Sequence, residues 1–350
     1  MRAKKILTFV LFLIYIGCIA LVAQNSPEKY IAYRTIDTIQ IDGKLTEESW
    51  KNVDWTSDFI DIAKDIAPRY ATKMKMLWDK QNIYFLVVMK EPHVWGDITK
   101  RDAVIFHNND FEVFIDPNGD THNYYEFEIN ALNTVWDLML SRPYRYGARV
   151  DNGWDIKGLK TAVYVDGTLN NPTDIDNSWT VEIAMPWEAF KDYKRQSVNP
   201  KNNFWRFNFS RVQWKHDVDN GTYKRKINPK TGKRFAEDNW VWSKQGAVSM
   251  HMPEKWGYVF FSSKKAGQKT TWEIPNDEHL KSKLYLAFQK IWGNKRRSVK
   301  KHELTAIEIE GKSVTPVIEE EEKGWKVWVK SPFTNKIVAI KEDGKIIYDE

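Results

Sequence analysis

The fold is decided at Asp110-Phe-Glu-Val-Phe-Ile-Asp116, the turn Pro117-Asn-Gly-Asp120, and Tyr124-Tyr-Glu-Phe-Glu-Ile-Asn130. In both outer runs apolar and polar side chains alternate, as they do along a strand with one buried face. Proline, asparagine and glycine between the runs favour a tight turn. The stretch therefore predicts an antiparallel β-hairpin whose polar face carries Glu126, Glu128 and Asn130.

The same kind of pattern continues on both sides of this hairpin, from about residue 30 to 262. Turn signals such as Asn171-Pro172 and Asn199-Pro200 separate the runs. Many strands joined by long loops predict an all-β domain over residues 27–262, built as an antiparallel β-sandwich. Further strands are expected at 74–78, 83–89, 159–165, 179–185, 204–214 and 256–261.

A smaller unit is expected at the C-terminus. Residues 262–270 are polar and resemble a linker, and residues 277–292 carry apolar side chains at helical spacing. Short strand-like runs follow at 305–309, 325–329, 337–340 and 345–348. Residues 271–350 are therefore predicted to form a small α+β appendage.

The N-terminus has the pattern of a secretory signal peptide. Arg2, Lys4 and Lys5 precede an apolar run over residues 6–23, and polar residues follow. Residues 1–23 are predicted to be cleaved, which leaves no membrane span and an exported chain that is periplasmic, outer-membrane-associated or secreted. Two alternatives are an uncleaved anchor, since ~18 apolar residues just span a bilayer, and lipidation at Cys18.

Cysteine content and charge exclude several classes of function. Cys18 is the only cysteine, so a cleaved chain has no disulfide, cysteine nucleophile or cysteine metal ligand. The net charge is +6, and removal of the three basic residues of the signal leaves +3. So small a net positive charge does not indicate a nucleic-acid-binding protein.

Tryptophan is unusually frequent, with 17 residues in a chain whose mean hydropathy is −0.58. A polar protein with so many tryptophans is expected to leave some of them open to solvent. Flat aromatic faces suit ligands with apolar faces and polar edges, and sugars are such ligands.

Four further segments, together with the central hairpin, resemble the family 9 carbohydrate-binding modules, especially the family-9-like proteins exported by Bacteroidetes-type bacteria. They are Ile41-Asp-Gly-Lys-Leu-Thr-Glu-Glu-Ser-Trp50, Leu77-Trp-Asp-Lys-Gln-Asn-Ile-Tyr-Phe85, Trp179-Thr-Val-Glu-Ile-Ala-Met-Pro-Trp187 and Met250-His-Met-Pro-Glu-Lys-Trp-Gly257. The resemblance implies a jelly-roll-like β-sandwich that binds an oligosaccharide or polysaccharide between aromatic side chains. It also implies a role in polysaccharide breakdown beside other glycan-degrading proteins, and structural calcium in some members.

The resemblance suggests two tryptophans that clamp a sugar. Trp95 is the first candidate, because it follows a core strand in a turn-rich loop. Trp240 and Trp242 are candidates for the second, and Trp214 is a weaker one. Sugar hydroxyls also need polar partners. The candidates for that role are Glu126, Glu128, Asn130, Arg211 and His251.

Calcium is the metal that the residues allow. Asp116, Asn118 and Asp120 offer hard oxygen ligands within one turn, although the same residues also make a good turn without an ion. The histidines show no H-E-x-x-H pattern, so zinc is not expected.

Two other classes of function stay open at this level. A glycoside hydrolase acting on O-glycosyl bonds needs two carboxyl groups about 5–9.5 Å apart, and Glu112 with Glu126 or Glu128 fits that need on paired strands. A haem or electron-transfer sandwich would use Met250, His251 or Met252 as axial ligands. A sandwich that only binds other proteins is the remaining alternative.

Overall fold

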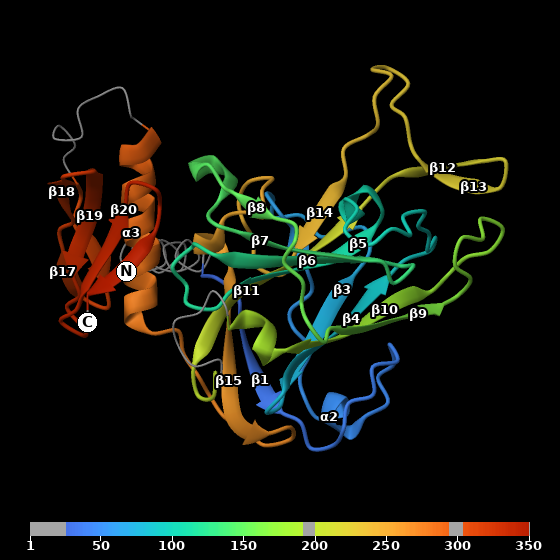
Figure 1. The fold of residues 1–350 in the computed structure, drawn as a ribbon, viewed down its shortest axis with the longest axis horizontal. Helices are drawn as coiled ribbons and strands as arrows, with labels where there is room; N and C mark the ends of the chain where they lie inside the picture. Colours follow the sequence, from blue (N-terminus) through green and yellow to red (C-terminus); the bar gives the residue numbers. More distant parts are fainter. Residues whose placement is uncertain (1–25, 192–199, 294–303, 350) are drawn as a thin grey trace, which may run out of the picture.

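The computed structural model describes residues 26–191, 200–293 and 304–349 (Figure 1). The predicted signal peptide and Cys18 lie outside these residues, so cleavage and lipidation stay predictions. Among the described helices, none is both long and apolar enough to cross a membrane.

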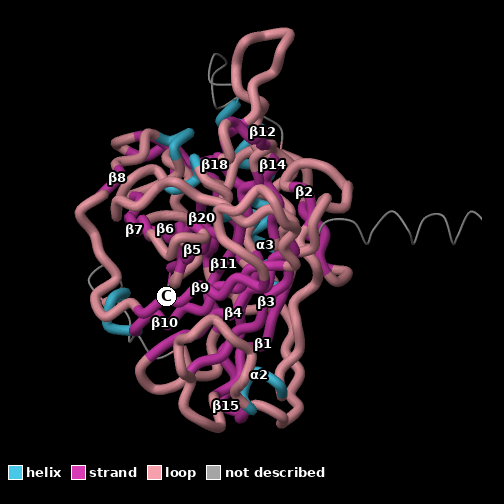
Figure 2. Tube along the Cα trace, turned by 90° about the vertical axis from the view of Figure 1, so that its right-hand side faces the viewer, coloured by secondary structure: helices cyan, strands magenta, loops and turns pink. Residues whose placement is uncertain are grey.

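A large open β-sandwich makes up most of the molecule. Its thirteen strands follow the order β8-β7-β6-β5-β11-β15-β1-β3-β4-β10-β9, with β14 paired to β11 and β2 paired to β14. Strands β5, β6 and β7 form one layer, and β3, β4, β10 and β9 form the other (Figures 1 and 2). All pairings are antiparallel except those of β1, which runs parallel to both β15 and β3. The all-β, jelly-roll-like prediction is confirmed.

The strands of the sandwich include all those predicted from alternation, and several more. Their bounds are β1 (Lys29–Arg34), β2 (Ile60–Asp61), β3 (Thr72–Trp78), β4 (Asn82–Lys90), β5 (Asp110–Asp116), β6 (Tyr124–Asn130), β7 (Val135–Leu140), β8 (Val150–Asp151), β9 (Lys160–Asp166), β10 (Ser178–Pro186), β11 (Phe204–Gln213), β14 (Asp238–Val241) and β15 (Gly257–Lys265). A separate hairpin, β12 (His216–Asp219) and β13 (Thr222–Arg225), projects from the sandwich (Figure 1). The short helices are α2 (Glu48–Lys51), η1 (Ile105–His107), η2 (Tyr144–Tyr146), η3 (Trp187–Phe190) and η4 (Pro253–Lys255).

The core lies between the two layers. On β5 and β6 the core includes the apolar face of the predicted hairpin, with Phe111, Val113, Phe127 and Ile129. The core also includes seven tryptophans, namely Trp78, Trp154, Trp179, Trp187, Trp205, Trp240 and Trp242. All 17 tryptophans are described; twelve are buried, five are half-buried and none is exposed. Five tryptophans are therefore partly open to solvent, and the other twelve are inside because a sandwich of this size has room for them.

The C-terminal unit pairs one helix with a small sheet, as predicted. Helix α3 (Asn276–Gly293) packs on β18 (Val317–Glu321), β19 (Gly324–Lys330), β20 (Ile337–Lys341) and β21 (Ile346–Asp349), beside the hairpin of β16 (Ile307–Ile309) and β17 (Lys312–Val314). Helix α3 lies between that sheet and the sandwich (Figure 1). Arg145 joins the two units by donating to Glu254 at 2.7 Å and reaching the hydroxyl of Tyr285 on α3 at 3.4 Å.

Candidate functional site

A cavity of about 380 Å³ opens over the face of β5 and β6 that points away from the core. We call it the carboxylate pocket. It is lined by Ile62, Phe106, Glu112, Phe114, Glu126, Glu128, Trp136, Tyr144, Val212, Glu237, Asn239, Val248, Ser249, Met250 and His251. Three predicted ligand residues, Glu126, Glu128 and His251, meet in its wall.

The floor of the pocket carries buried acids brought together by strand register. Glu112 on β5 lies directly opposite Glu128 on β6. One carboxylate oxygen each from Asp110, Glu112 and Glu128 lies within 4.8 Å of the other two. Their residues are 0, 5 and 1% exposed, and Glu126 is 6% exposed. The polar face of the predicted hairpin is therefore not open to solvent, because loops cover it.

Burial governs the ionisation of these acids. It raises the pKa of Glu112 to about 7. It raises the pKa of Glu126 and of Glu128 well above the ordinary value, and the neighbouring carboxylates add to both shifts. Within the described ranges, no lysine, arginine or histidine nitrogen lies within 4.0 Å of the four carboxylates. The acids therefore hold protons at a pH where free carboxyl groups have lost them.

Backbone donors hold the acids in place and leave some of their oxygens unused. Phe106 N donates to Glu128 Oε2 at 2.9 Å, and Val212 N donates to Asp110 Oδ1 at 3.3 Å. Asp110 Oδ2 is fully buried and has no hydrogen-bond partner. An unpaired buried carboxylate oxygen is costly, so Asp110 is the least well satisfied acid of the cluster.

Aromatic, uncharged side chains lie beside the acids. Trp136 on β7 lies across from Glu128 and is half-buried, and Tyr144 is 52% exposed. His251 Nδ1 lies 3.0 Å from the hydroxyl of Tyr124. Burial, with a smaller contribution from Arg145, lowers the pKa of His251 to about 4, so the ring is neutral at pH 7. The pocket thus combines flat apolar surface with hydrogen-bonding oxygens.

The four tryptophans expected to clamp a sugar do not offer open faces. Trp95, Trp240, Trp242 and Trp214 are 2, 3, 1 and 7% exposed. Trp240 and Trp242 lie in the core. Trp95 and Trp214 pack with Tyr223 of β13, and the ring of Trp95 stacks on Tyr223 at 6.0 Å. The prediction that Trp95 is open to solvent is wrong, because the β12–β13 hairpin packs on it.

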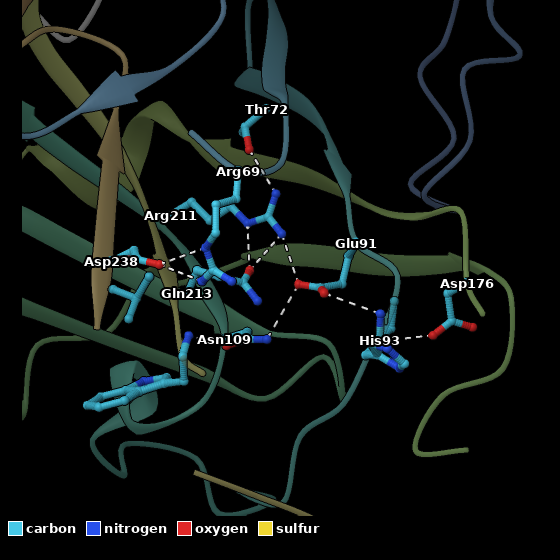
Figure 3. A network of polar contacts seen from close by, with 12 residues as sticks. Arg69, Thr72, Glu91, His93, Asn109, Asp176, Arg211, Gln213 and Asp238 are labelled. Atoms are coloured by element: carbon cyan, nitrogen blue, oxygen red, sulfur yellow. Dashed lines mark hydrogen bonds and ion pairs between the residues drawn. The ribbon is translucent and has the colours of Figure 1, made fainter. Parts of the chain in front are cut away.

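Arg211 and Asn130 lie in hydrogen-bond networks of the fold itself. Arg211 Nη2 donates to Glu91 Oε2 at 2.9 Å and to Gln213 Oε1 at 2.7 Å, and the Arg211 side chain is fully buried (Figure 3). Asn130 Nδ2 donates to Ile98 O at 2.8 Å, and its Oδ1 accepts from the backbone of Thr134 at 3.0 Å. Both residues order the sheet around the pocket and leave no free group for a sugar hydroxyl.

The turn proposed for calcium is held by its own hydrogen bonds. Asp116 accepts from Gly119 N at 2.9 Å and from Thr121 N at 2.8 Å, and Asp120 accepts from His122 N at 2.8 Å. Asn118 Oδ1 accepts from Asp120 N at 3.4 Å. All three side chains thus accept hydrogen bonds from the turn backbone, and calcium at this turn stays a prediction.

Two other hollows contain tryptophan side chains. A hollow of about 830 Å³ touches Trp78 and Trp187, but these indoles are 3 and 5% exposed and donate their N–H groups to backbone carbonyls. A hollow of about 410 Å³ lies beside Trp292 where the appendage meets the sandwich. Of these three hollows, the carboxylate pocket alone joins predicted ligand residues to a half-buried tryptophan.

The raised pKa of Glu112 predicts that the protein loses stability as the pH rises. The folded state keeps its proton up to about pH 7, whereas the unfolded chain releases it near pH 4.3. The free energy of unfolding should therefore fall between about pH 4.5 and 7, by about 3–4 kcal/mol from this residue. Urea unfolding of wild type and Glu112→Gln at pH 5 and pH 8 checks this. Equal falls in both proteins would refute it.

A β-sandwich with one aromatic-walled polar pocket defines a class of small-ligand-binding domains. The chain belongs to the carbohydrate family 9 binding domain-like family, whose model matches residues 41–263. This match covers more than half of the chain.

The curated relatives are much longer proteins. Residues of this chain are 24% identical over 166 positions to endo-1,4-beta-xylanase A of Thermotoga neapolitana and to that of Thermotoga maritima. Each match takes in 46% of this chain and 13% of the relative. The chain therefore corresponds to only a small part of those proteins.

Solved structures are similar to this chain at low sequence identity. A putative carbohydrate-binding protein from Bacteroides uniformis is 16% identical with a TM-score of 0.48, and covers 67% of this chain and 100% of its own. A family 9 carbohydrate-binding module from Caldicellulosiruptor kristjanssonii in complex with glucose is 16% identical with a TM-score of 0.42, and covers 70% of this chain and 100% of its own. The same module was also solved with cellotriose, at a TM-score of 0.41.

Proposed function

We propose that the protein binds a carbohydrate in the carboxylate pocket. The observation that carries this proposal is the meeting of half-buried Trp136 with Glu126 and Glu128 around one open cavity. A sugar ring stacks on an indole face, while its hydroxyls donate to carboxyl oxygens. Membership of a carbohydrate-binding family supports the same conclusion.

We also propose that the protein binds carbohydrate outside the cytoplasm, close to proteins that degrade glycans. The predicted signal peptide supports export to the periplasm, the outer membrane or the medium. The matched relatives are named xylanases, and a matching segment inside such enzymes supports a role beside glycan-degrading proteins. Binding then serves to hold polysaccharide close to the proteins that cleave it.

Hydrolysis is the second candidate, because Glu112 and Glu128 carry oxygens within 4.8 Å of each other. In a glycosidase the two carboxyl groups flank the scissile bond. Here both residues rise from adjacent strands of one sheet face, so they reach a ligand from the same side. The geometry therefore favours binding without cleavage, and a reducing-sugar assay on bound glycans separates the two functions.

Trp136→Ala is expected to weaken binding of the best sugar ligand about tenfold, because it removes the stacking surface and its burial. The ligand is found by screening plant, algal and host glycans, and affinity is measured by calorimetry. Trp272→Ala is the matched control, since this half-buried tryptophan stacks on Phe260 outside the pocket. Equal affinities of wild type and Trp136→Ala, or a wild type that binds no glycan, would contradict the proposal.

A further inference from the structure

We infer that the carboxylate pocket selects sugars that carry a protonated amine, such as glucosamine units, over neutral sugars of the same size. This inference rests on the proposed carbohydrate binding and names the chemical class of its ligand. It follows from the charge, the spacing of the oxygens and the shape of the pocket.

Among the described residues, the pocket is lined by acids and by no lysine or arginine. Glu112, Glu126, Glu128 and Glu237 all line the cavity, and Asp110 lies beside Glu112 and Glu128. Arg145 is already engaged, because it donates to Glu254 Oε2 and, at 2.9 Å, to the carbonyl of His251, and Arg225 interacts electrostatically with Glu237. Burial favours the protonated form of Glu112, Glu126 and Glu128 in the free protein, and a ligand ammonium favours their ionised form because it supplies the missing cation.

The spacing of the acids fits an ammonium group. Such a group has three N–H donors, and each bond to a carboxylate spans about 2.8 Å. Three acceptors in tetrahedral directions around one nitrogen then lie about 4.6 Å apart. The oxygens of Asp110, Glu112 and Glu128 lie within 4.8 Å of one another, and Asp110 Oδ2 has no partner within the protein.

The size and walls of the cavity indicate an organic cation. A divalent ion needs six to eight oxygens within about 2.6 Å and little further space. The cavity measures about 380 Å³, enough for one sugar ring, and it is walled by Trp136, Tyr144 and Phe106. Aromatic faces next to an ammonium add cation–π attraction.

Calorimetry on the EDTA-treated protein tests this inference with three oligosaccharides of equal length: a glucosamine oligomer, its N-acetylated form and a glucose oligomer. The amine form is expected to bind at least tenfold more tightly than the other two at pH 6.5 and low salt, and to weaken as salt is added. Glu128→Gln and Glu112→Gln should remove most of this preference. Glu188→Gln, an exposed glutamate on η3, is the control and should keep it.

Three other outcomes would count against the amine preference. Equal affinities for the three oligomers would overturn the amine preference and leave carbohydrate binding standing. Absence of binding by all three, with another glycan bound in a Trp136-dependent way, would also overturn it. A calcium-induced rise in melting temperature that is lost in Glu128→Gln, without amine binding, would assign the cluster to a metal ion instead.

Discussion

Arg211→Met is expected to lower the free energy of unfolding by about 3–5 kcal/mol, which is the largest effect that we predict for a single substitution. Arg211 is fully buried and pairs with Glu91, which is 1% exposed (Figure 3). Methionine fills much of the same volume but leaves Glu91 as an uncompensated buried charge. Burial already raises the pKa of Glu91, and Arg211 opposes that shift.

Chemical denaturation with a matched surface pair gives the measurement. Arg69 pairs with Asp238 close to the same network but is about half exposed, so Arg69→Met should cost at most about 1 kcal/mol. The double variant Arg211→Met/Glu91→Gln should recover part of the loss, because it removes the orphaned charge. A loss below 1 kcal/mol for Arg211→Met would show that the network does not support the fold.

Glu182→Ala is expected to cost about 3 kcal/mol or more. Glu182 on β10 accepts three hydrogen bonds, from Trp50 Nε1 at 2.9 Å and Gly43 N at 3.0 Å, which are buried, and from Asp42 N at 2.9 Å, which is partly buried. Alanine leaves these donors without an acceptor and opens a cavity at the junction of α2 with the sheet.

Thermal or urea unfolding checks this value against two companions. Glu182→Gln keeps one acceptor oxygen and should cost less than alanine. Glu188→Ala changes an exposed side chain a few residues away, and should stay within about 0.5 kcal/mol of wild type. If Glu182→Ala and Glu188→Ala unfold alike, the buried hydrogen bonds do not stabilise this corner.

Much of the sandwich could be predicted because its strands and turns are specified by residues that are close together in the sequence. Alternation in Phe111-Glu-Val-Phe-Ile115, followed by proline, asparagine and glycine, specifies a strand and a turn without reference to distant residues. The spacing of Leu280, Leu284, Phe288 and Ile291 likewise specifies α3, and the structure places all four in the core of the appendage.

The candidate site could be predicted only in part, because burial depends on segments far apart in the chain. The pattern identified Glu126 and Glu128, but not the loops around residues 237–251 that cover them. It assigned Trp95 to an open loop, whereas Tyr223 from the β12–β13 hairpin packs on it. No local signal reports such a contact between residues 128 positions apart.

Trp136 was missed although a signal for it existed. It lies on β7, where Trp136, Leu138 and Leu140 alternate with Val135, Asp137 and Met139. The strand follows Asn133, which adopts a left-handed conformation typical of turns. This period-two pattern would have placed Trp136 on the same face as Leu138, next to the glutamates of β6.

A crystal structure with the best-binding oligosaccharide tests the central claim most directly, because it locates the ligand among the three hollows. We predict electron density for a sugar ring against Trp136, with polar groups of the sugar within about 3.2 Å of oxygens of Glu112, Glu126 or Glu128. Density beside Trp78 and Trp187, or beside Trp292, with the carboxylate pocket free of sugar, would contradict it.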